Sequence, residues 1–202
     1  MAILYNGTIK KGFMVTVNAI SSDTIEIKGS KFIAFLMPMA MYEEQMASLR
    51  SHHPKAVHFV SATRSLNEFD QIVEYSGDDG EPKGTSGKPT LSVLQGHELI
   101  NAAIITVRYF GGTKLGPGGL VRAYAEVANA AYSQAELLPY EKLFEKRIQC
   151  DYSHITFVEY ECIQNNVQIL NKDFGVHGAI FEIQGTQDRL DRLLNVLGRC
   201  VV

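Results

Sequence analysis

The sequence predicts an α+β protein of two domains that divide near Pro139. Short apolar or alternating runs typical of strands occur beside longer runs with helical periodicity. Pro139 follows the longest helical run, and strand and helix patterns begin again beyond it. We therefore expect an N-terminal domain over residues 1–138 and a C-terminal domain over residues 139–202. A chain of 202 residues has room for two small domains.

Apolar spacing and turn residues define the expected elements of the N-terminal domain. Strands are expected over residues 15–20, 24–27, 31–37, 56–62, 69–75 and 102–109, with a turn at residues 21–23. Helices are expected over residues 41–51, 89–94 and 118–138. The run 102–109 is the most apolar and is expected to be buried on both faces. Near residues 69–75, a short helix capped by Asn67 is the alternative to a strand.

The C-terminal domain has the pattern strand, helix, strand, strand, helix. We expect strands over residues 144–152, 167–173 and 178–184, a helix over residues 154–164 capped by Ser153, and a last helix through Leu197 capped by Thr186. The second and third strands form a hairpin. This order is most of a ferredoxin-like split βαβ unit, whose final strand could only be the short segment 200–202.

Composition indicates an ordinary globular protein, with 46% hydrophobic and 20% charged residues. The net charge of -3 argues against a protein that coats nucleic acid throughout. From residue 83 to residue 122, however, there are five basic residues and one acidic residue, which gives a local charge of +4. A local field of this sign steers anionic partners.

Localisation is predicted from cysteine usage and from hydropathy. Three cysteines without a C-x-x-C pair indicate reduced, mostly buried thiols in the cytoplasm. The N-terminus lacks the pattern of a signal peptide. No apolar run approaches the roughly 18 residues of a membrane span, so we expect no membrane partner.

The segment 108–124, RYFGGTKLGPGGLVRAY, is the most informative part of the chain. Five of the nine residues from 111 to 119 are glycine, and an apolar strand precedes them while a helix follows. Backbone N–H groups of such a loop and of a helix start form a candidate anion site. The residues assigned to it here are Arg108, Gly111, Gly112, Lys114, Gly116, Gly118, Gly119 and Arg122. The alternative is a tight connection that needs small residues for packing.

Two nucleotide-binding templates do not fit this loop. A dinucleotide fingerprint would need glycine where Val121 stands. A P-loop would need Lys followed by Ser or Thr after Gly116, but Pro117 and Gly118 follow. Nucleotide hydrolysis is therefore disfavoured.

The segment 78–89, DDGEPKGTSGKP, is a second candidate. Asp78, Asp79 and Glu81 are candidate ligands of a divalent cation, although they lack the spacing of a calcium loop. The alternative is a rigid recognition loop that adds Lys83 and Lys88 to the basic surface. Neither segment has the spacing of a nucleophile or a general base, so no catalytic residue and no cofactor are predicted. His58 has the default interpretation of a core or surface histidine.

Together the two segments resemble the YigZ/IMPACT family. The segment 29–34, GSKFIA, and His58 fit the same family, and the resemblance is strong over residues 15–130. One departure is Thr63, which stands where relatives often have tyrosine. The resemblance implies a first domain similar to domain IV of elongation factor G, and a ferredoxin-like second domain similar to its domain V.

The resemblance also implies a role in translation. Eukaryotic IMPACT relatives look like regulators that bind a protein partner, and the bacterial branch points to nucleic-acid or ribosome binding. We therefore expect a non-enzymatic protein whose two glycine-rich segments converge into one basic, water-facing surface for RNA or the ribosome, with weak sequence specificity. The alternatives are a protein-interaction regulator and a metal-dependent phosphate-ester hydrolase.

Overall fold

The computed structural model describes residues 14–201, and the chain divides into two compact units. The first unit ends at Tyr140 and the second begins at Glu141, two residues beyond the predicted boundary. Each unit has its own hydrophobic core. Among residues 14–201, no helix combines the length and the apolar character that a membrane span requires.

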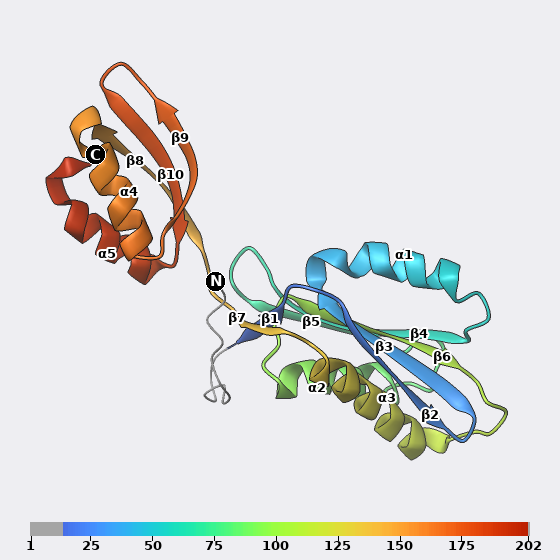
Figure 1. Ribbon diagram of the computed structural model, residues 1–202. Helices are drawn as coiled ribbons and strands as arrows, with labels where there is room; N and C mark the ends of the chain where they lie inside the picture. The colour runs from blue at the N-terminus through green and yellow to red at the C-terminus, as the bar shows by residue number, and fades with distance from the viewer. Residues whose placement is uncertain (1–13, 202) are drawn as a thin grey trace. The chain divides into compact units, whose positions relative to one another are not determined.

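The first unit is built around a five-stranded antiparallel sheet, with the strands in the order β2-β3-β6-β4-β5 (Figure 1). Its strands are β2 (Ser21–Ile27), β3 (Ser30–Pro38), β4 (His58–Leu66), β5 (Ile72–Gly77) and β6 (Ala102–Tyr109). β6 lies in the middle of the sheet and is buried from Ala102 to Arg108, which confirms the strand predicted from the apolar run. A separate antiparallel pair consists of β1 (Val15–Val17) and β7 (Leu137–Pro139).

Helices cover both faces of this sheet. The 3₁₀ turn η1 (Met39–Met41) leads into α1 (Tyr42–His52) on one face, and α2 (Gly87–Gly96) and α3 (Gly116–Ser133) lie on the other (Figure 1). Successive residues of β6 point to opposite faces. Ile105 therefore joins the core with Leu49 of α1, whereas Ile104 joins the core with Leu94 and Tyr124.

The strand expected over residues 15–20 ends at Val17, and two further expectations for the first unit are wrong. Residues 21–23 form the start of β2 instead of a turn, because they pair with residues 34–36 of β3. The long helix ends at Ser133 instead of residue 138, because Leu137 and Leu138 pair with β1. In both places tertiary pairing outweighs the local pattern. Of the two interpretations near residues 69–75, the strand is confirmed as β5.

The second unit contains a three-stranded antiparallel sheet in the order β8-β10-β9. Its elements are β8 (Phe144–Asp151), η2 (Tyr152–His154), α4 (Ile155–Gln164), β9 (Gln168–Phe174), β10 (Gly178–Gly185), α5 (Gln187–Leu197) and η3 (Gly198–Cys200). The predicted order and the hairpin are confirmed, and the Thr186 hydroxyl accepts a hydrogen bond from the N–H of Arg189, as expected for an N-cap.

Two expectations for the second unit differ from the structure. His154 occupies the N-cap of α4 and Ser153 lies in η2, because a 3₁₀ turn precedes the helix. Residues 198–200 form η3, so no fourth strand follows α5 within the described residues. The described part of this unit therefore has five of the six elements of a ferredoxin-like fold.

Candidate functional site

Asp78 holds the loop that joins β5 to α2. Its carboxylate accepts hydrogen bonds from the N–H groups of Gly84 (2.7 Å) and Gly87 (2.8 Å) and from the hydroxyl of Ser86 (2.7 Å). Burial raises the pKa of Asp78, but these hydrogen bonds outweigh it, and the net result is a lowered pKa. Asp78 therefore shapes the loop and the start of α2.

Asp79 connects the same loop to β4 and α1. One carboxylate oxygen accepts a hydrogen bond from the N–H of Phe59 at 2.6 Å, and the other lies 3.1 Å from Nη2 of Arg50. Its backbone carbonyl contacts Nδ1 of His58 at 2.8 Å. These bonds fix both the loop and the ring of His58.

Glu81 is the centre of a buried polar cluster. Its side chain is 3% exposed, and Oε1 accepts hydrogen bonds from Nη1 of Arg108 (2.5 Å) and from the hydroxyl of Tyr124 (2.7 Å). Oε2 lies 3.9 Å from Nε2 of His58. Burial raises the pKa of Tyr124 and the Glu81 carboxylate raises it further, so this hydroxyl remains a donor. The guanidinium of Arg108 also lies 5.2 Å from the ring of Phe32.

The predicted cation site does not form in the described residues. Asp78, Asp79 and Glu81 turn toward three different sets of donors: loop amides, Arg50 with β4, and Arg108 with Tyr124. Between residues 14 and 201, no three His, Cys, Asp or Glu side chains gather as a metal would require. The three carboxylates therefore do not converge on one point, as the ligands of a single cation must.

The glycines of segment 108–124 have different roles. A side chain at Gly111 would lie 1.9 Å from the backbone of Gly29, so this position requires glycine for packing. Gly112 and Gly116 have φ of 84° and 72°, which glycine adopts without strain, and open space surrounds them. Gly118, in the first turn of α3, also faces open space. A side chain at Gly119 would lie 3.0 Å from Cβ of Leu115. The packing interpretation therefore holds for Gly111 and fits Gly119, whereas Gly112, Gly116 and Gly118 leave the start of α3 accessible.

The two glycine-rich segments meet at a pocket of about 400 Å³. Gly80, Glu81 and Pro82 line it from one segment, and residues 114–117 line it from the other. His58, Arg108, Phe110 and Leu120 complete the lining. The amino terminus of α3 borders the pocket. A helix start has N–H groups without an intrahelical partner and the positive end of the helix dipole, although Pro117 itself has no N–H.

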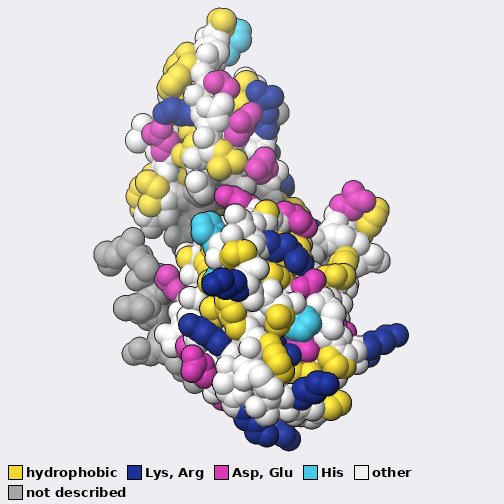
Figure 2. Space-filling model, turned by 90° about the vertical axis from the view of Figure 1, so that its right-hand side faces the viewer, with side chains coloured by type: hydrophobic (Ala, Val, Ile, Leu, Met, Phe, Trp, Pro, Cys, Tyr) yellow, Lys and Arg dark blue, Asp and Glu magenta, His cyan; other side chains and the backbone are white. Residues whose placement is uncertain are grey.

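The predicted basic side chains fall into two groups. Lys83, Lys88, Lys114 and Arg122 are exposed and form no ion pair with any described residue. Arg108, in contrast, is 6% exposed and neutralised by Glu81, so the expectation that it faces water is wrong. Figure 2 views the side at which β6 leads into α3, and Lys and Arg side chains are spread over it among acidic and hydrophobic ones.

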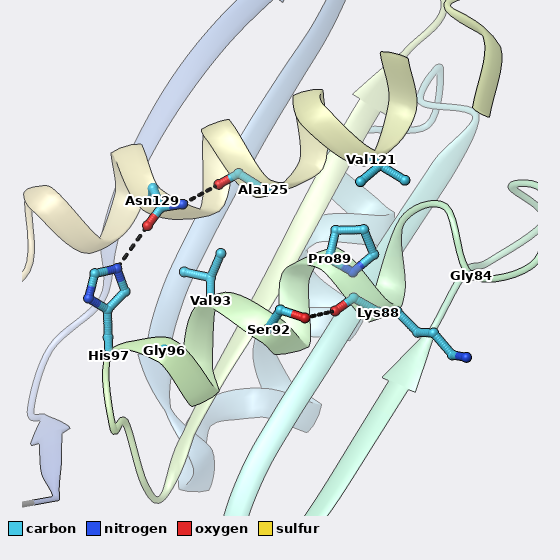
Figure 3. Close-up of a pocket in the computed structure, with 10 residues that line it drawn as sticks. All are labelled: Gly84, Lys88, Pro89, Ser92, Val93, Gly96, His97, Val121, Ala125 and Asn129. Carbon is cyan, nitrogen blue, oxygen red and sulfur yellow. Dashed lines mark hydrogen bonds between the residues drawn. The ribbon is translucent and has the colours of Figure 1, made fainter. Parts of the chain in front are cut away.

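A second pocket, of about 510 Å³, lies between α2 and α3 (Figure 3). Pro89 faces Val121 across it and Val93 points toward the part of α3 that carries Ala125, while the side chain of Lys88 points away. At its far end, Nε2 of His97 lies 2.8 Å from the side-chain oxygen of Asn129. This groove was not predicted, because the helical pattern alone does not show that the two helices lie side by side.

Sequence reasoning also missed the buried cluster. Glu81 lies 27 positions from Arg108 and 43 from Tyr124 along the chain. Nothing in the sequence linked Tyr124 to Glu81, and His58 had only the default interpretation of a core or surface histidine. No local spacing signals this cluster, because its members come from β4, the β5–α2 loop, β6 and α3, which are brought together only in the folded unit.

Comparisons with known proteins give a consistent result. The family model described as the Impact N-terminal domain matches residues 28–132. An IMPACT family member from Haemophilus influenzae and the IMPACT family member YigZ from Escherichia coli are each 38% identical over 154 and 153 residues, which is 74% of this chain and 74% of each relative. A solved structure described as a hypothetical protein has a TM-score of 0.62 and 30% identity, covering 92% of this chain and 91% of that one.

Proposed function

Because the chain belongs to the IMPACT family, we propose that it is a non-enzymatic, translation-associated protein that binds RNA or the ribosome. The binding surface consists of the four exposed cations Lys83, Lys88, Lys114 and Arg122, together with the accessible start of α3. We call it the basic surface. Such a role places the protein in the cytoplasm, where translation takes place.

The observation that carries this proposal is that these four cations have no acidic partner in the described residues. A surface lysine without an internal partner is free to contact phosphate, and each contact releases a condensed counterion. Gly112, Gly116 and Gly118 leave open space beside the helix start, where a phosphate can approach the backbone. The chain as a whole has a net charge of -3, so the excess of positive charge is confined to this surface.

The ribosome fits the fold that the family resemblance implies. We propose that the first unit is similar to domain IV of elongation factor G and that the second, with its βαββα order, is similar to domain V. Domains of this kind belong to a factor that works on the ribosome. A cationic loop surface on the first unit would then face ribosomal RNA.

Charge reversal tests the proposal. Changing Lys114→Glu together with Arg122→Glu should lower the affinity for RNA or ribosomes at least tenfold in a filter-binding assay. The matched control reverses Arg192 and Arg199, which are exposed in the second unit and change the net charge equally. Unchanged affinity in the first variant, with an intact circular dichroism spectrum, would exclude the basic surface as the binding site.

A protein partner in translational control is the second candidate, and one observation favours it. β5 is an edge strand of the sheet, and its side chains Ile72, Val73 and Tyr75 are about half exposed. Edge strands with exposed apolar side chains are common docking elements for other chains. Pull-downs with and without nuclease separate the two candidates: partners that disappear after nuclease treatment were held through RNA.

A further inference from the structure

The pocket between the two glycine-rich segments contains an unsatisfied acceptor. Both hydrogen bonds to Glu81 reach Oε1, and Oε2 accepts none from residues 14–201 although the side chain is 3% exposed. Because a carboxylate oxygen can only accept hydrogen bonds, Oε2 is left to solvent or to a donor that a ligand supplies. Glu81 lines the pocket, and a ligand in the pocket is in a position to supply that donor.

His58 places a second acceptor beside the first. Its Nδ1 contacts the carbonyl oxygen of Asp79, which only accepts, so Nδ1 carries the hydrogen. In the neutral ring, Nε2 then presents a lone pair, 3.9 Å from Oε2 of Glu81. Two acceptors cannot hydrogen-bond each other, and this pair is matched by one donor group with two hydrogens, such as an amino group.

The rest of the lining is largely apolar. Pro82, Phe110, Leu115 and Pro117 contribute to the walls, and Phe110 is 48% exposed. The volume of about 400 Å³ falls in the range of small-molecule sites, in which apolar walls surround a few polar groups. A planar ring that carries an amino group has these properties, because its faces suit apolar walls and aromatic stacking.

We infer that this pocket accommodates one unpaired nucleobase that carries an exocyclic amino group, and that it discriminates against uracil. The inference rests on the proposed RNA binding and adds a base preference to it. The amino group of cytosine, adenine or guanine donates to Glu81 and His58, whereas the O4 of uracil would place a third acceptor against them. Phosphates of the same strand lie on the basic surface, since Lys114 and the start of α3 border the pocket.

Cytosine and uracil provide the matched pair for a test. Oligo(rC) and oligo(rU) of equal length have the same phosphates and sugars, so the contribution of the basic surface cancels in their ratio. One well-placed base contact is enough to discriminate between two bases by about tenfold. We expect the full chain to bind oligo(rC) about tenfold more tightly than oligo(rU), measured by fluorescence anisotropy with labelled oligonucleotides.

Two variants assign the preference to this pocket. His58→Phe removes one acceptor and should reduce the rC/rU ratio to near one, while the matched control His52→Phe, on an exposed histidine at the end of α1, should leave the ratio unchanged. In Glu81→Gln, the amide oxygen is expected to face Arg108 and Tyr124, and the amide NH₂ then faces the pocket. That variant should favour oligo(rU), because a donor now meets O4.

The outcomes separate this inference from the function on which it depends. Equal affinities for oligo(rC) and oligo(rU) in the unmodified protein, with salt-dependent binding of both, overturn the base pocket and leave the RNA-binding proposal intact. A preference for oligo(rC) that survives in His58→Phe also overturns it. Failure to bind either oligonucleotide overturns the proposed RNA binding and the base pocket together.

Discussion

Replacing Glu81 with alanine should destabilise the first unit severely. The carboxylate is the partner that the structure gives to two buried donors, the guanidinium of Arg108 and the hydroxyl of Tyr124. The side chains of Glu81 and Arg108 are 3% and 6% exposed. Removing the carboxylate leaves the cation desolvated and without its counter-charge, which is the costly way to break an ion pair.

The magnitude follows from burial. Leaving one member of a buried ion pair without its partner costs about 3–5 kcal/mol. An entire domain is stabilised by about 5–15 kcal/mol, so this single change removes a large share of the total. Replacing both partners with apolar side chains, as in Glu81→Leu with Arg108→Met, removes the isolated charge and should recover most of the loss.

Hydrogen exchange is the appropriate assay, because the two units need not unfold together. Amides of β6 report the stability of the first unit, and urea dependence of their exchange gives its free energy of unfolding. The control is Glu182→Ala, measured at the amides of β10 in its own unit, since Glu182 pairs with Arg147 at 3.9 Å where the two side chains are 44% and 65% exposed. Exposed pairs contribute about 0–1 kcal/mol. A loss in Glu81→Ala no larger than in this control would refute the reasoning.

Three further outcomes are expected. Gly111→Ala should destabilise the protein because the new Cβ would meet backbone atoms, whereas Gly118→Ala, at an open position in a helix, should stabilise it by about 0.5–1 kcal/mol in thermal denaturation. Burial raises the pKa of Asp78, but its hydrogen bonds lower it below the ordinary 3.8, so its stabilisation is present above that value and is lost as pH falls through the lower folded-state pKa. Asp78→Asn should therefore flatten this part of an acid titration followed by circular dichroism. Burial raises the pKa of Cys162 to about 11, so iodoacetamide should modify the partly exposed Cys200 well before Cys162, as mass spectrometry of the native protein would show.

Local patterns correctly predicted those helices and strands whose position depends mainly on their own residues. Most residues of the run 102–109 are apolar. This run forms β6, whose two faces are both covered by helices. The helix at residues 41–51 was recognised from one apolar stripe and is displaced by a single residue in α1. Thr186 caps α5 because a threonine before a helical run has a local partner.

Features that depend on contacts between distant parts of the chain could not be predicted from the sequence. Arg108 follows an apolar strand and precedes a glycine loop, so it looked like a surface cation, yet Glu81 neutralises it from another loop. Asp78 and Asp79 looked like metal ligands because carboxylates cluster in sequence, but loop amides and Arg50 use them. The base preference that we infer was hidden for the same reason, because Glu81 of the β5–α2 loop and His58 of β4 come close only in the folded chain.

The salt dependence of RNA binding tests the central claim most directly. With four free cations, Lys83, Lys88, Lys114 and Arg122, contacting the phosphates of a single strand, log K should fall with log[salt] with a slope of about −3. The variant with all four changed to glutamine should show a slope near zero and an unchanged fold by circular dichroism. An equally steep slope in that variant, or a flat one in the unmodified protein, would contradict the assignment of RNA binding to the basic surface.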